Sequence, residues 1–169
     1  RVTMSFPRNV GQIPVYYNAK NTGRPFDENQ KYTSKYLDVS NTPLYPFGYG
    51  LSYTSFTYGD IKLNKSVLSS ASKITATITV TNNGDYDGDE VVQLYIQDLV
   101  GSITRPVKEL KGFQKVMLKK GESREISFPI SIEDVKFFNH DLKWVAEPGD
   151  FKVYIGPNSR DVKVAAFKL

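Results

Sequence analysis

The sequence predicts an all-β fold, an antiparallel β-sandwich preceded by a segment of different character. From about residue 55 onward, short stretches of alternating apolar and polar residues follow one another. Residues typical of turns separate these stretches, as in antiparallel sandwiches and barrels. No stretch has the length and 3.6-residue period of a long amphipathic helix.

The first predicted strands lie between residues 56 and 118. Residues 56–64 form the first, and in residues 74–81 Ile, Ala and Val alternate with Thr, a period of two that predicts one apolar face. In residues 92–97, Val, Leu and Ile alternate with Gln and Tyr. Residues 107–118 form a long mixed run, and Gly112 inside it predicts a bulge or bend.

A proline and a capping residue mark the next elements. Ile and Phe alternate with Ser and Pro in residues 126–132. Pro129 has no N–H to donate to a neighbouring strand, which predicts a sheet edge or a bulge there. Residues 132–138 suggest one helical turn, with Ser131 as its N-cap.

The last strands surround a turn. Residues 142–145 and 151–155 flank the turn at residues 147–150, which contains Pro and Gly, and residues 162–167 close the chain. The sandwich would hold about 115 residues, the size of an immunoglobulin-like domain. Because the chain has no Cys and its one Trp, Trp144, comes late, the fibronectin type III class fits better than the antibody class.

The first third of the chain differs from the rest. Eight of the 11 tyrosines precede residue 59, residues 2–6 and 13–17 have the pattern of short strands, and residues 18–42 are polar and rich in Asn. This is too little apolar sequence for a separate core, so we expect it to pack on the sandwich or lie loose.

Residues 43–54 join the two parts. Two prolines, two glycines and four aromatic residues crowd into Pro-Leu-Tyr-Pro-Phe-Gly-Tyr-Gly-Leu-Ser-Tyr. Proline fixes φ and lacks an N–H, and glycine permits positive φ, so neither an ordinary helix nor a central strand is expected. We predict an irregular link held by burial of its rings.

Composition excludes several classes of function. The net charge is +4, but the basic residues do not cluster as nucleic acid binding would require. Without Cys there are no disulfides and no thiolate metal sites. No apolar run approaches the roughly 20 residues of a membrane span. The chain opens on an alternating strand pattern with no starting Met, so we expect a fragment whose export signal lies elsewhere.

Polar residues that resemble active-site groups have simpler explanations. His140 is expected at an exposed turn. Asp85, Asp87 and Asp89 start like a calcium loop, but Glu90 and Ile96 stand where an EF-hand needs Gly and Glu. Asp27, Glu28 and Asp38 are acids in the aromatic-rich region, and their spacing does not distinguish a catalytic pair from a solvated loop.

Several motifs stand out along the whole chain, at residues 23–25, 32–38, 44–53, 80–85, 89–95, 105–113 and 147–149. Together and in this order they resemble the C-terminal region of family 3 glycoside hydrolases, of the periplasmic β-glucosidase type. The resemblance implies a parent with a barrel, then an α/β sandwich domain, then a fibronectin type III-like domain. Residues 1–42 would end the α/β sandwich domain, residues 43–54 would be a linker, and residues 55–169 the last domain.

The resemblance also implies what this chain does not contain. Such enzymes are retaining β-glucosidases, with a nucleophile and an acid/base in the upstream domains, so no catalytic residue, metal or cofactor is expected here. The expected partners are those upstream domains and the β-glucoside or oligosaccharide substrate of a periplasmic or secreted parent. Nucleic acid and membranes are not expected, and a homodimer is left open.

Seven residues are predicted to line the domain junction or the mouth of the substrate site: Arg24, Tyr36, Asp38, Tyr45, Phe47, Tyr49 and Tyr53. Tyrosine suits both roles, because it combines an apolar ring with a hydrogen-bonding tip. Two other functions stay open from the sequence: a carbohydrate-binding β-sandwich module and an adhesion or interaction sandwich.

Overall fold

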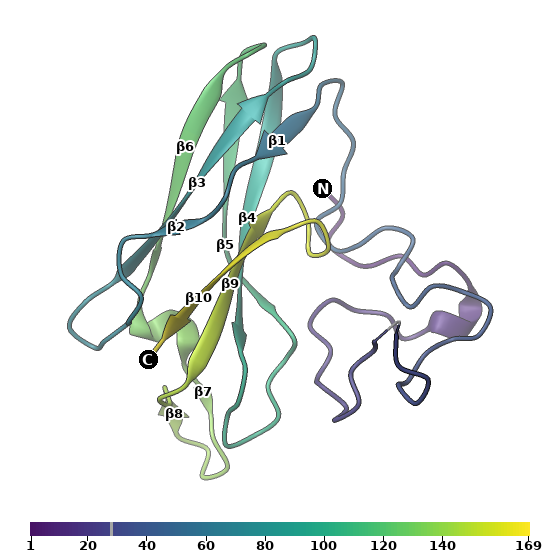
Figure 1. Cartoon of the computed structure of the whole chain (residues 1–169), viewed down its shortest axis with the longest axis vertical. Helices are drawn as coiled ribbons and strands as arrows, with labels where there is room; N and C mark the ends of the chain where they lie inside the picture. The colour runs from purple at the N-terminus through teal and green to yellow at the C-terminus, as the bar shows by residue number, and fades with distance from the viewer. Residues whose placement is uncertain (28) are drawn as a thin grey trace.

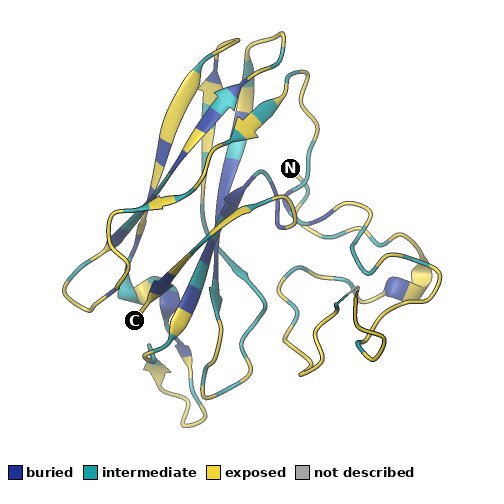
Figure 2. Ribbon diagram, viewed as in Figure 1, coloured by how far each residue is buried: buried dark blue, intermediate teal, exposed yellow. Residues whose placement is uncertain are grey.

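The computed structural model of the chain describes residues 1–27 and 29–169 and confirms an all-β sandwich (Figure 1). Two antiparallel sheets face each other, and the N-terminal segment runs beside them without regular strands. Most strand residues of the sandwich are buried or intermediate, whereas the N-terminal segment is largely exposed (Figure 2).

One sheet is centred on β3 (Ile74–Asn82). β6 (Ser123–Ile130) pairs with β3 along nearly its whole length, while the short β1 (Phe56–Tyr58) and β2 (Lys62–Leu63) pair with successive parts of it. The strand predicted at residues 56–64 is therefore two short strands, separated by residues 59–61, of which Gly59 still donates its N–H to the carbonyl of Thr79 at 2.9 Å.

The other sheet has the order β10-β9-β4-β5. Its strands are β4 (Gly88–Asp98), β5 (Glu109–Leu118), β9 (Asp150–Gly156) and β10 (Lys163–Lys168). A small hairpin of β7 (Phe137–Phe138) and β8 (Trp144–Val145) projects from one end of the sandwich (Figure 1). The 3₁₀ turns η1 (Val10–Gln12) and η2 (Ile132–Val135) are the helical elements of the described residues.

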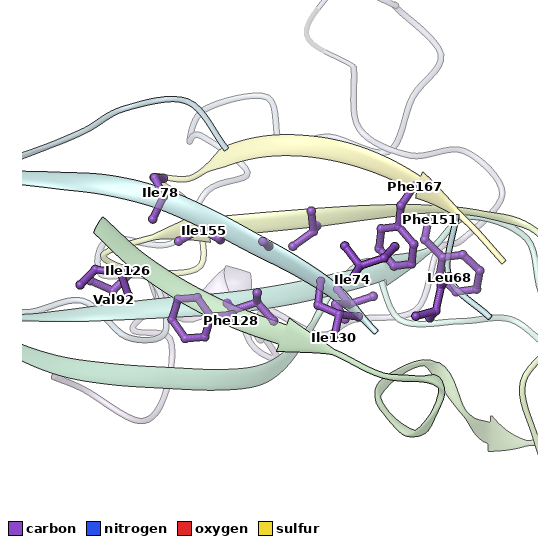
Figure 3. Close-up of a cluster of buried hydrophobic side chains, with 14 of the residues drawn as sticks. Leu68, Ile74, Ile78, Val92, Ile126, Phe128, Ile130, Phe151, Ile155 and Phe167 are labelled. Carbon is purple, nitrogen blue, oxygen red and sulfur yellow. The ribbon is translucent and has the colours of Figure 1, made fainter. Parts of the chain in front are cut away.

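The hydrophobic core lies between the two sheets (Figure 3). Every second side chain of β3 is buried, as the Thr-rich alternation predicts. The core side chains in the close-up include Leu68, Ile74, Ile78, Val92, Ile126, Phe128, Ile130, Phe151, Ile155 and Phe167. The rings of Phe151 and Phe167 stack at 5.2 Å between centroids and join β9 to β10. Burial of this kind contributes roughly 25 cal/mol per Å² of apolar area.

Three local predictions are confirmed. The pairing register of β4 and β5 shifts opposite Gly112, where Leu94 pairs with Gly112 but Tyr95 pairs with Leu110, so a bulge lies there. Pro129 lies in β6, which pairs with β3 alone and is an edge strand. Ser131 is the N-cap of η2 in a capping box, in which its N–H donates to the Asp134 carboxylate at 2.7 Å.

The strands predicted at residues 2–6 and 13–17 are wrong. Phe6 makes one isolated bridge with Tyr45, and residues 13–17 have no strand partner. In residues 13–17, Ile13 is exposed and Val15 and Tyr17 are only half-buried, so no sheet face fully buries this half of the alternating pattern. Alternation predicts a strand only where a second backbone and a core are available.

Candidate functional site

The outer face of the sheet β10-β9-β4-β5 is the most distinctive surface of the molecule, because residues 1–54 cover its centre. Gln93 and Tyr95 of β4 point away from the core, yet they are only 3% and 0% exposed. β4 is therefore buried on both faces, and its dark blue stretch in Figure 2 marks this. We call the contact between residues 1–54 and this outer face the junction.

Three aromatic rings form the apolar part of the junction. Phe47 from the link stacks on Tyr17 at 4.3 Å between centroids, with an interplanar angle of 25°. Tyr17 in turn meets Tyr95 edge to face at 5.7 Å. Such pairs contribute about 0.5–1.5 kcal/mol each beyond their buried area. The rings thus connect residues that are 30 to 78 positions apart in the chain.

The side-chain amide of Gln93 forms the polar part. Its Nε2 donates to the carbonyl of Gly48 at 3.2 Å and to that of Pro157 at 2.6 Å. Its Oε1 accepts a hydrogen bond from the Tyr95 hydroxyl at 2.5 Å. Both donors and the carbonyl oxygen are therefore satisfied, as a buried amide requires.

Backbone hydrogen bonds fix the link on both sides. On one side, Val2 donates to Tyr49 and Gly48 donates to Val2, both at 2.8 Å. On the other, Ser159 donates to the carbonyl of Phe47 at 2.9 Å. The link is thus held between the opening residues of the chain and the loop that follows β9.

An ion pair closes one edge of the junction. Arg1 pairs with the carboxylate of Glu90, which is itself buried and also accepts a hydrogen bond from the Val91 N–H at 2.7 Å. Burial raises the pKa of Tyr58, and the negative charge of Glu90 raises it further. Tyr58 therefore stays neutral beside this pair.

Residues 1–42 are held by polar contacts more than by a core. Gln12 is the buried residue of this stretch among those described. Its Nε2 donates to the carbonyl of Ser40 at 2.6 Å, and its Oε1 accepts from the N–H of Arg8. This agrees with the expectation that the segment has too little apolar sequence for a core of its own.

The predicted site residues are divided by the structure. Phe47 lies in the junction, and Tyr45 and Tyr49 pack against each other at 5.1 Å beside it. Tyr53 projects into solvent with 97% of its surface exposed. Arg24, Tyr36 and Asp38 are exposed in the loops of residues 18–42 and do not touch the junction rings.

The acidic and metal-like candidates do not form a centre. His140 lies exposed at the turn between β7 and β8. Asp85 pairs with Lys120 at 2.8 Å, and Asp89 with Lys115 at 2.9 Å, so these acids are part of a charged surface. Within residues 1–27 and 29–169, no three His, Cys, Asp or Glu side chains gather to hold a metal ion. Glu28 lies outside the described residues.

Sequence reasoning missed Tyr17, Gln93, Tyr95 and Lys108. Each occurs in a pattern that also suits an exposed position, but partners distant in sequence bury Gln93 and Tyr95 and half-bury Tyr17 and Lys108. A glutamine and a tyrosine on the polar face of a strand carry no local signal of burial. The one usable hint was the density of aromatic residues before residue 59, which needs a surface to cover.

Comparison with known proteins identifies this architecture. Residues 90–159 match the fibronectin type III-like domain. The chain is 53% identical over 171 aligned positions to a periplasmic beta-glucosidase of Salmonella typhimurium, and the match covers 100% of this chain and 22% of that protein. A beta-xylosidase of Formosa agariphila is 44% identical, with coverage of 100% and 23%.

Solved structures agree. The beta-glucosidase of Listeria innocua, in complex with glucose, superposes with a TM-score of 0.90 at 44% identity, over 98% of this chain and 23% of that one. The chain thus spans less than a quarter of the length of these relatives. Among the described residues, no helix has the length and apolar character needed to cross a bilayer.

The fold and the junction define a fibronectin type III-like β-sandwich that carries an N-terminal extension on one sheet. Along its whole length the chain matches the C-terminal region of family 3 glycoside hydrolases of the periplasmic β-glucosidase type, and the resemblance drawn from its motifs is confirmed. The boundaries proposed at residues 42 and 54 stay a prediction.

Replacing Gly48 by alanine tests how tightly the junction is packed. Gly48 has φ +80°, and an added Cβ would lie 2.0 Å from Oε1 of Gln93, whose side chain is held by three hydrogen bonds. We expect the free energy of unfolding, measured by denaturant titration, to fall by about 1–3 kcal/mol more than in the control. The control is Gly23→Ala, which has φ +79° but no heavy atom within 4 Å of the added Cβ. Equal losses in the two variants would contradict close packing at Gly48.

Alkaline pH tests the burial of Tyr95. Burial raises the pKa of Tyr95, so the folded state keeps a proton that the unfolded state releases above about pH 10. Stability from this group is complete below that pH and falls as the pH rises, by up to about 1.4 kcal/mol per pH unit. We expect Tyr95→Phe to be less stable than the unsubstituted chain at pH 8, by about 1 kcal/mol for the lost hydrogen bond. The gap should narrow between pH 10 and 11.5, and a constant gap would contradict the assignment.

Proposed function

We propose that this chain is the non-catalytic C-terminal part of a retaining β-glucosidase and serves there as a structural and positioning module. The observation that carries the proposal is the pattern of similarity to the Salmonella protein, which spans all of this chain but 22% of that relative. The remaining length of a parent would hold the barrel and the α/β sandwich domain, with the nucleophile and the acid/base.

The surface of residues 1–54 supports upstream domains as the partner. This segment exposes many large apolar side chains that the sandwich does not cover: Met4, Val10, Ile13, Tyr32, Leu37, Leu51 and Tyr53. Exposed apolar side chains concentrated in one segment are typical of an interaction surface. Residues 1–42 would complete the α/β sandwich domain, and the junction would then fasten that domain to the sandwich.

The names of the relatives support a proposal for the substrate and compartment of the parent. The proposed parent acts on terminal β-linked glucose, by analogy with proteins named beta-glucosidase, and is periplasmic or secreted like the Salmonella relative. The similarity to a beta-xylosidase shows that this region is shared by proteins named for different sugars. The residues that select the sugar are therefore expected outside this chain.

Hydrolysis assays test the proposal directly. We expect the purified chain to release no p-nitrophenol from p-nitrophenyl β-glucoside, whereas the longer protein that contains it does, because both catalytic carboxylates lie upstream. Turnover by the chain alone, after removal of contaminating glucosidase by two orthogonal chromatography steps, would overturn the non-catalytic assignment. If the longer protein cleaves only β-xylosides, the proposal that this chain is a non-catalytic module stands, and only the proposed substrate changes.

A second function, carbohydrate binding, has one observation in its favour. Phe138 and Trp144 face each other across the β7–β8 hairpin at 4.9 Å between centroids, and they are 58% and 49% exposed. Exposed aromatic faces suit the apolar C–H face of a sugar ring, and the hairpin projects from the sandwich (Figure 1).

Titration calorimetry separates the two functions. A carbohydrate-binding module should give saturable heat with laminarin or cellobiose at millimolar concentration, and Trp144→Ala should abolish it. The matched control is Tyr53→Ala, which removes an exposed ring far from the hairpin in sequence. We expect flat titrations for all three proteins, because a positioning module needs no sugar contact.

A further inference from the structure

A hollow of about 300 Å³ lies at the junction. The N-terminal segment and the link line one side of it, and the residues before β5 and after β9 line the other. Its polar lining residues are Ser5, Lys108, Ser159 and Arg160, and Tyr16 and Tyr17 add aromatic surface.

Lys108 is the unusual group in this hollow. Its ammonium donates to the carbonyl of Ser159 at 2.8 Å and lies 4.6 Å above the centroid of the Tyr154 ring. Within residues 1–27 and 29–169, no carboxylate comes within ion-pair distance of it. Burial lowers the pKa of Lys108, which reflects a cation taken out of water with only neutral partners.

The neighbouring groups leave the same imbalance. The hydroxyl of Ser5 is buried and has no hydrogen-bond partner among the described residues. Arg160 is already neutralised, since Nε and a terminal nitrogen bind the Asp161 carboxylate at 3.1 and 3.2 Å. The hollow therefore presents one unmatched positive charge and one unpaired hydroxyl. Buried cations are normally paired, so this arrangement is costly while the hollow holds no anion.

We propose that this hollow is a carboxylate-binding site, in which Lys108 supplies the charge and Ser5 a hydrogen bond. One unmatched positive charge suits a monoanion, and a carboxylate accepts from an ammonium and a hydroxyl at once. The same chemistry has two sources: a free small carboxylic acid, or an Asp or Glu side chain from the upstream part of a longer polypeptide. The inference does not depend on the hydrolytic activity proposed for the parent.

Acetate is the probe for the isolated chain. The side-chain methylene signals of Lys108 are followed by NMR during titration with sodium acetate, with sodium chloride at equal ionic strength and neutral acetamide as controls. We expect a saturable shift with acetate alone, while exposed Lys119 responds equally to both salts. Equal, non-saturating responses of Lys108 to acetate and chloride would overturn the proposal, and this measurement needs no variant that might fail to fold.

Variants assign the roles within the site. In these variants acetate binding is followed by the backbone signals of Ser159 and Tyr154, which neighbour Lys108. Lys108→Gln should abolish the saturable shifts of these signals. Ser5→Ala should weaken acetate binding about fivefold, the value of one hydrogen bond. Lys119→Gln should leave binding unchanged. Unaltered acetate binding in Lys108→Gln would place the anion elsewhere and contradict the proposal.

The longer protein identifies the source. Modification of Lys108 by an amine-directed reagent is measured by mass spectrometry in both proteins, with and without acetate. If an upstream side chain fills the site, Lys108 in the longer protein is protected and acetate adds nothing. If the ligand is a free acid, acetate protects Lys108 in both proteins. Protection in neither protein would overturn the proposal, whatever the hydrolysis assays show.

Discussion

The amide of Gln93 is the constraint on which the rest of the junction depends. A buried amide must find partners for two donors and an acceptor, and here they come from three different parts of the chain: Gly48, Pro157 and Tyr95. No local structure could satisfy this group. The link, the loop after β9 and the outer face of β4 therefore take one mutual arrangement, and Phe47 and Tyr17 pack within it.

This arrangement changes the mechanics of the sandwich. In a sheet with one solvated face, only the core side restricts bending and twisting of the strands. β4 is packed on both faces, so both sides restrict it. Motion of the link must then move β4, because Gly48 approaches Gln93 too closely for even one added methyl group. In a longer polypeptide, a contact made by residues 1–42 would be transmitted to the sandwich through a rigid connection. That is the property a positioning module requires.

The sequence predicts well what neighbouring residues decide. The Thr alternation of β3, the bulge at Gly112 and the edge proline at position 129 depend on local sterics and on one core face, and all three are confirmed. The strands predicted at residues 2–6 and 13–17 are wrong because residues 2–6 meet the link through only one isolated bridge and residues 13–17 have no strand partner. The burial of Tyr95 and the half-burial of Lys108 could not be predicted, since the groups that cover them come from distant parts of the chain: Tyr17 for Tyr95, and Tyr154 and Ser159 for Lys108.

The junction also accounts for why similarity in this region says little about the sugar. Its residues satisfy one another's hydrogen bonds and pack ring against ring. Within the described part of the chain, the donors and acceptors in these contacts are therefore already occupied and do not recognise the hydroxyl groups of a sugar. Proteins named for glucose and for xylose share the region at 53% and 44% identity with this chain. The exception is the hollow at Lys108, where among the described residues the ammonium has no carboxylate partner and the Ser5 hydroxyl has no hydrogen-bond partner. A group that supplies the missing charge there would strengthen the same contact that Gln93 organises, because Ser159 links both through its N–H to Phe47 and its carbonyl to Lys108.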